Sequence, residues 1–173
     1  MRPALPAWEQ RSADYGNLFN PAFLMLVLAA ACKGFESEQK GISDERQLGM
    51  PFVLFFLAVP LALSREFNDE RPRRLAGSLV SWLRKNPAAT ANISAAAYSL
   101  VPVVREGIVF ALRTGHLQAG DDGRFRSGRT HGELQLDVRT DLLAHLNNAG
   151  FAGRWLAKSG TLAPILEAFG LRP

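Results

Sequence analysis

The side chains that most often carry catalysis or bind metals are sparse and scattered along this 173-residue chain. His116, His131 and His145 have no partner at metal-ligand spacing, which favours ordinary surface histidines over a metal site. Neighbouring carboxylates fall in predicted turns, where solvation and turn formation explain them better than acid–base chemistry: Asp44-Glu45, Asp69-Glu70 and Asp121-Asp122. Neither a glycine-rich phosphate loop nor a nucleophile elbow is present. The sequence therefore predicts no catalytic residue, no cofactor, no metal site and no enzyme activity.

Three arginines, Arg124, Arg126 and Arg129, follow a turn signal at Asp122-Gly123. An Asp-Gly pair favours a tight hairpin, and a helix followed by such a hairpin is typical of a winged helix. The arginines would give this wing a basic edge that contacts DNA phosphates or a partner protein. Sequence-specific reading of DNA is disfavoured, because the preceding segment VVREGIVFALRT offers few polar side chains to a groove and is expected to be buried.

A second group of arginines and lysines lies beside aromatic residues near the C-terminus. Arg154 and Lys158 are four residues apart and share one face of a predicted helix, and Arg172 follows in the same terminal segment. Arginine next to an aromatic side chain is typical of the centres of protein interfaces. We therefore predict that Arg154, Trp155, Lys158 and Arg172 bind a partner. The alternative is that Trp155 packs in the core and Arg154 caps a helix end internally.

Helical signals dominate the segments that must position these residues. The sequence predicts a mainly α fold with seven or eight helices in one domain and a single β-hairpin at about 116–127, the winged-helix-like wing. Asn20 and Pro21 are typical of a helix start. The other predicted helices cover 51–65 (kinked at Pro60), 75–85, 87–100, 103–114, 136–148, 151–159 and 162–169.

The remaining segments are interpreted as connections. Residues 1–13 form an extended N-terminal arm, and 14–173 form the single domain. Residues 34–49 are polar and predict a loop, and a charged turn at 68–74 carries the arginines Arg71, Arg73 and Arg74. These three arginines are interpreted as solvated residues.

Composition sets limits on location and partners. A hydrophobic share of 47% supplies a real core, and a net charge of +4 permits binding to nucleic acid or acidic partners without demanding it. A single cysteine, Cys32, fits a reducing compartment and a core position. The apolar runs at 21–32 and 51–63 are shorter than the roughly 20 residues that span a bilayer. We expect a cytoplasmic protein without membrane contact; association through 51–63 is the weaker alternative.

Several segments together resemble the middle component of bacterial three-component ABC systems. Their order and spacing agree with that family over nearly the whole chain after residue 14. Residues 34–49 and the Arg- and Gly-rich stretch 124–133 depart from the family pattern. The matching segments are NLFNPAF (17–23), PFVLFFLAVPLAL (51–63), LVSWLRKNP (79–87), SLVPVVREGIVFALRTGHL (99–117), FAGRWLAKSG (151–160) and FGLRP (169–173).

The resemblance implies a small non-enzymatic protein that works with two partners. One would be a Rad50- or SMC-like ABC ATPase, and the other a larger effector subunit such as a nuclease, as in Lamassu-type anti-phage systems. The chain would then be an adaptor or scaffold that couples the ATPase to the effector and meets DNA indirectly or non-specifically. The alternative function is a stand-alone winged-helix DNA-binding regulator.

Overall fold

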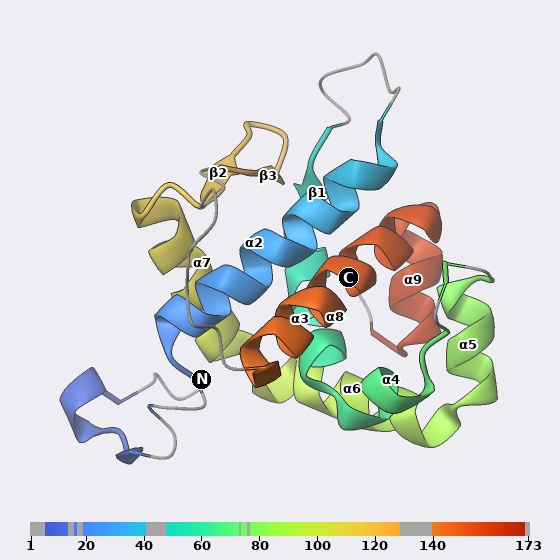
Figure 1. Cartoon of the computed structure of the whole chain (residues 1–173), viewed down its shortest axis with the longest axis horizontal. Coiled ribbons are helices and arrows are strands. Elements are labelled where there is room, and N and C mark those ends of the chain that lie inside the picture. Colours follow the sequence, from blue (N-terminus) through green and yellow to red (C-terminus); the bar gives the residue numbers. More distant parts are fainter. Residues whose placement is uncertain are drawn as a thin grey trace.

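The computed structural model describes residues 6–13, 16, 19–40, 48–72, 74–75, 77–128 and 140–171. Within these residues the protein is mainly α-helical, as predicted, with eight α-helices and one three-stranded antiparallel sheet (Figure 1). The elements are η1 (Trp8–Gln10), α2 (Pro21–Glu38), β1 (Met50–Pro51), η3 (Phe52–Leu54), α3 (Phe55–Leu63), α4 (Arg65–Glu70), α5 (Leu79–Lys85), α6 (Pro87–Ser99), α7 (Val101–Arg113), β2 (Leu117–Ala119), β3 (Arg124–Ser127), α8 (Thr140–Lys158) and α9 (Leu162–Ala168).

Helix α2 lies at the centre of the fold, where its nearly continuous apolar surface is buried. It packs against α8, α7, α3 and β3 (Figure 1). The predicted start is confirmed: Asn20 Oδ1 accepts a hydrogen bond from Ala22 N at 2.8 Å, and Pro21 occupies the first turn. The predicted loop at 34–49 begins later than expected, because α2 continues to Glu38.

Helices α2 and α8 run side by side in the same direction, and glycines let their backbones approach closely. A Cβ on Gly34 would overlap the backbone of Gly150, and a Cβ on Gly153 would overlap the carbonyl oxygen of Ala31. One of the helix predictions is wrong in this region. The separate helices 136–148 and 151–159 are one helix from Thr140 onward, and Gly150 lies within this helix without ending it.

Residues 50–70 form more elements than the single kinked helix that the sequence predicts. Pro51 belongs to β1 and is followed by the 3-10 turn η3, so the α-helix begins only at Phe55. Ser64 ends α3 with extended backbone angles and caps α4, accepting a hydrogen bond from Phe67 N at 3.1 Å. The predicted charged turn is therefore partly the helix α4.

The predicted hairpin is confirmed, but it is part of a three-stranded sheet. β2 and β3 pair around the turn at residues 120–123, where Gly123 has a φ of 74°. β1 pairs with the other edge of β3, through Met50 opposite Phe125, and gives the order β1-β3-β2. The sequence missed β1 because two residues, one of them proline, carry no strand signal. The comparison of this hairpin with a winged-helix wing stays a prediction.

Helices α5, α6 and α7 follow one another along one side of the molecule. Gly77, with a φ of 98°, delays the start of α5 to Leu79, whereas the predicted start of α6 at Pro87 is confirmed. α7 begins directly after Leu100, and α6 and α7 are bent by 64° to one another. In the described residues no single helix is long and apolar enough to span a membrane; only this bent pair reaches that length and composition together.

The N-terminal segment is held on α7 by an ion pair. Arg11 Nη1 and Nη2 donate to the two carboxylate oxygens of Glu106 at 2.7 and 2.8 Å, and the Arg11 side chain is only 5% exposed. Its guanidinium also lies 5.0 Å from the ring centre of Trp8. α7 was expected to be buried, but its outer face is exposed: Val109 is 52% exposed and Phe110 37%.

Candidate partner-binding surfaces

The predicted C-terminal surface is built on the outer face of α8, where Arg154 and Lys158 are both exposed. Lys158 Nζ lies 3.9 Å from Glu38 Oε2, so this lysine already has a loose partner at the end of α2. The Arg154 guanidinium lies 5.9 Å from the ring centre of Phe151, one turn earlier in the helix. Arg172, the fourth predicted residue, lies outside the described residues.

Trp155 belongs to the core and not to the exposed surface. It is 1% exposed, and its indole Nε1 donates a hydrogen bond to Gly77 O at 2.9 Å. Around it lie the rings of Phe67, Trp82 and Phe151, at centroid distances of 6.0, 6.0 and 5.5 Å. This geometry corresponds to the core alternative for Trp155, because almost none of the indole is available for a partner. The tryptophan holds α8 against the α4–α5 segment.

Arg71 is the residue that sequence reasoning missed. It was expected to be solvated, but it is half-buried, and its guanidinium lies 4.4 Å from the ring centre of Phe151. Its Nε donates to Asn148 Oδ1 at 3.1 Å. Burial lowers the pKa of Arg71, and the nearby charge of Arg154 lowers it further. No local signal could reveal this contact, since Asn148 is 77 residues away in the chain.

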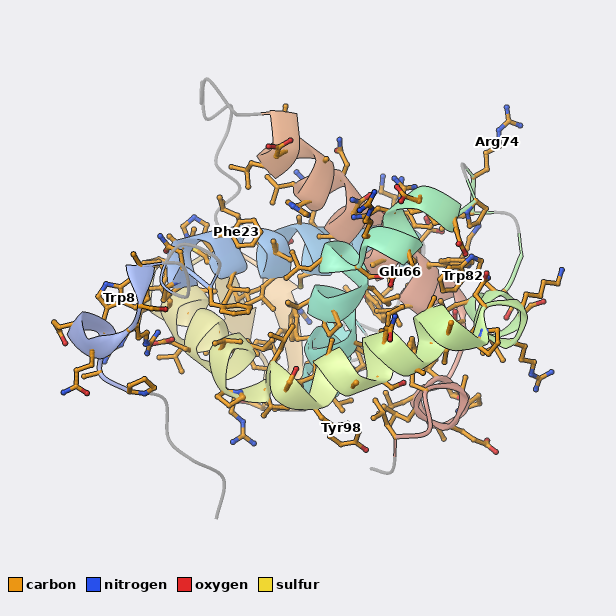
Figure 2. All side chains as sticks on the ribbon, turned by 90° about the horizontal axis from the view of Figure 1, so that it is seen from below. Trp8, Phe23, Glu66, Arg74, Trp82 and Tyr98 are labelled. Atoms are coloured by element: carbon orange, nitrogen blue, oxygen red, sulfur yellow. The ribbon has the colours of Figure 1, made fainter. Side chains whose placement is uncertain are left out.

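Beside this group the surface is hollowed between α4 and α5. The depression has a volume of about 210 Å³, and Trp82 on its wall donates its indole Nε1 to Glu70 O at 3.4 Å. Figure 2 shows Trp82 and Arg74 at the end of the molecule opposite Trp8, with Arg74 pointing away from the body. Arg73 lies outside the described residues. The lining residues are Glu70, Pro72, Gly77, Ser78, Ser81, Trp82, Lys85 and Trp155.

The predicted basic edge of the hairpin lies on the outer face of the sheet. Strand alternation buries Phe125 and leaves Arg124 half-buried and Arg126 exposed. Arg124 is used internally, because its Nη1 donates to Gly49 O at 3.0 Å and its Nε lies 3.6 Å from Asp122 Oδ2. Arg126 is the more exposed of the two. Arg129 lies outside the described residues.

A wide depression of about 620 Å³ accompanies these arginines. Its surface is mixed in charge, because two aspartates of the turn face it together with Arg124 and Arg126. It can therefore receive a phosphate or a polar protein surface, and it does not form a uniformly basic track. Its lining residues are Leu48, Gln118, Ala119, Gly120, Asp121, Asp122, Arg124 and Arg126.

The residues that could carry chemistry have structural roles where the structure describes them. Cys32 is buried, and its thiol donates to Phe125 O at 3.2 Å. His116 and His145 were expected at the surface, but His116 is 7% exposed and His145 packs edge-on against Phe23. Across the described ranges, no three His, Cys, Asp or Glu residues gather in a group that could hold a metal ion.

These features define a class of protein: a mainly helical domain that presents cationic side chains on two separate surfaces. Residues 8–173 match the model of the family described as ABC-three component (ABC-3C) system Middle Component 3, and the chain belongs to this family. The resemblance to a middle component that the sequence segments indicated is thereby confirmed. No match was found among curated proteins, and none among solved structures.

Proposed function

We propose that this chain is a non-catalytic adaptor that couples an ABC ATPase to an effector subunit. The family match over residues 8–173 carries the proposal, because a middle component works together with the other components of its ABC-three component system. The finer proposal is that the ATPase is SMC- or Rad50-like, that the effector is of the nuclease type, and that the assembly is a cytoplasmic, Lamassu-like defence against phages.

The arrangement of the two cationic surfaces supports an adaptor role. The hairpin β2–β3 and helix α8 lie on opposite sides of the central helix α2 (Figure 1). A chain of this shape can contact two partners at once without conflict between them. We assign the α8 surface, with Arg154 and Lys158, to the ATPase or the effector. The sheet surface, with Arg124 and Arg126, is assigned to DNA phosphates or to the ATPase.

Co-expression with the two neighbouring components of the system tests the proposal. The wild-type chain should co-purify with an ABC ATPase, whereas the variant Arg154→Glu with Arg172→Glu should stay folded and lose this association. Arg105→Glu, a charge reversal at an exposed residue of α7, is the matched control and should still assemble. Failure of the wild type to assemble, or ATP hydrolysis or DNA cleavage by the purified chain alone, would contradict the proposal.

DNA binding separates the adaptor from the alternative regulator. An adaptor should bind DNA weakly and without sequence preference, with an affinity that falls as salt rises. The variant Arg126→Glu should weaken that binding further. A strong preference for one sequence in the absence of partners would favour the regulator. The outer face of α7 argues against the regulator, since it exposes Val109 and Phe110 where a groove-reading helix needs polar side chains.

A further inference from the structure

Two guanidinium groups from distant parts of the chain meet at one aromatic ring. Arg71, in the segment after α4, lies 4.4 Å from the ring centre of Phe151, and Arg154, on α8, lies 5.9 Å from it. Arg71 is held in place by this contact and by its hydrogen bond to Asn148. We call this group the Arg71–Phe151–Arg154 site.

The site concentrates positive charge without a matching carboxylate. Burial lowers the pKa of the Arg71 guanidinium, and the nearby positive charge of Arg154 lowers it further. In the part of the chain that the structure describes, ion pairs involve Arg11, Arg65, Arg124 and Lys158, and none involves Arg71 or Arg154. Asn148 supplies only a neutral acceptor. An anion between the two guanidinium groups would relieve their repulsion.

We propose that the Arg71–Phe151–Arg154 site is a receptor for an aspartate or glutamate side chain of a partner subunit; this rests on the adaptor function. A guanidinium binds a carboxylate through two parallel hydrogen bonds, and a guanidinium already stacked on a ring loses less freedom on binding. The neighbouring Trp82 adds an aromatic side chain of the kind found in interface hot spots.

The surroundings favour a protein carboxylate over a nucleic acid. Glu70 lines the adjacent depression, and Glu38 lies beside Lys158 one turn beyond Arg154. A phosphate backbone carries a charge at every nucleotide and requires a continuous basic track. Acidic residues interrupt any such track here. A single acidic side chain from a partner needs only the two guanidinium groups.

The isolated chain can be tested with simple probes. A tetraglutamate peptide, inorganic phosphate and a dodecathymidylate strand are titrated separately, with the fluorescence of Trp82 and Trp155 as the signal in a Trp8→Phe background. We expect saturable binding of the peptide. Arg154→Gln and Arg71→Gln should each weaken it about tenfold, the loss of one charge-assisted hydrogen-bonded pair. Arg65→Gln, at an arginine on α4 whose side chain is 92% exposed, is the matched control and should leave the affinity unchanged.

Arg71→Lys adds a test of the geometry, because lysine keeps the charge but lacks the planar fork. Arg71→Lys should therefore also weaken peptide binding. The melting temperature of Arg154→Gln should be unchanged, which would show that this variant keeps the native fold. The assignment is overturned if the wild type does not bind the peptide, if Arg154→Gln binds equally well, or if phosphate or the DNA strand binds more tightly through the same arginines. If the chain co-purifies with the ATPase but does not bind the peptide, only the proposal of a carboxylate receptor is rejected. If the chain binds the peptide but does not co-purify with the ATPase, only the adaptor function is rejected.

Discussion

Gly153 of α8 lies so close to the carbonyl oxygen of Ala31 in α2 that a Cβ at position 153 would overlap this oxygen. The central helix pair therefore makes backbone-to-backbone contact. Such contact is possible only where a side chain is missing on one side, and a backbone atom cannot move away as a flexible side chain can.

Gly153→Ala should consequently destabilise the protein by about 2–3 kcal/mol, because the two helices must separate to admit the methyl group. Gly150→Ala is the matched control in the same helix, since its Cβ would meet only Ala30 O at 3.7 Å. Alanine is favoured in a helix, so this control should be neutral or stabilising by up to about 1 kcal/mol. Urea unfolding measures both. Equal free energies of unfolding for the two variants would show that the close contact at Gly153 does not restrict the side chain at this position.

We expect the buried thiol of Cys32 to make the protein less stable at high pH. Burial raises the pKa of its thiol above the usual value of 9.0, the charge of Glu36 raises it further, and a hydrogen bond with the Met50 backbone acts in the opposite direction. The native state thus holds the proton more tightly than the unfolded state. The stability that this difference contributes is fully present below the pKa of the thiol in the unfolded chain. Above that pKa, the free energy of unfolding decreases by about 1.4 kcal/mol per pH unit. Urea unfolding at pH 8 and pH 10 should show a steeper loss for the wild type than for Cys32→Ala.

The ion pair of Arg11 and Glu106 should couple the N-terminal segment to α7. Two hydrogen bonds join these charged groups, and the arginine side chain is almost fully buried. A double-mutant cycle with Arg11→Gln and Glu106→Gln should give a coupling energy of about 1–2 kcal/mol. Either single variant should also increase hydrogen exchange around η1. Additive single effects would mean that the pair contributes no net coupling.

Asn20 should contribute to stability as a helix cap. Replacing it by alanine removes the acceptor for Ala22 N and should cost about 1 kcal/mol. Ser78 precedes α5 in the same position but makes no side-chain cap hydrogen bond. Ser78→Ala is therefore the control and should change the free energy of unfolding by a few tenths of a kcal/mol at most. Thermal or urea unfolding of both variants decides between a real cap and a mere sequence preference.

Local signals predicted the parts of this fold that are decided locally. Asn20-Pro21 and Asn86-Pro87 start helices where expected, and Asp122-Gly123 turns the hairpin. In each case a residue type has a backbone or hydrogen-bonding preference that the surrounding structure did not need to override.

Other features depend on contacts across the chain and left no local trace. Gly150 looks like a helix stop, yet its neighbour in space is Gly34 of α2. Arg71 looks like a solvated residue, yet its position is fixed by Asn148 and Phe151. Sequence neighbours were therefore enough to select Arg154 as a candidate partner-binding residue. They could not indicate Arg71, which comes from a segment about eighty residues earlier.

The parallel alignment of α2 and α8 has an electrostatic consequence. Each helix carries a macrodipole with its negative end at the C-terminus, and parallel packing brings both negative ends to the same place. Glu38 adds a full negative charge there, and Lys158, in the last turn of α8, lies 3.9 Å from it. Lys158 thus acts as a counter-charge to two helix ends. Its removal would leave a negative pole beside Arg154 and would redirect the field that an approaching acidic partner meets.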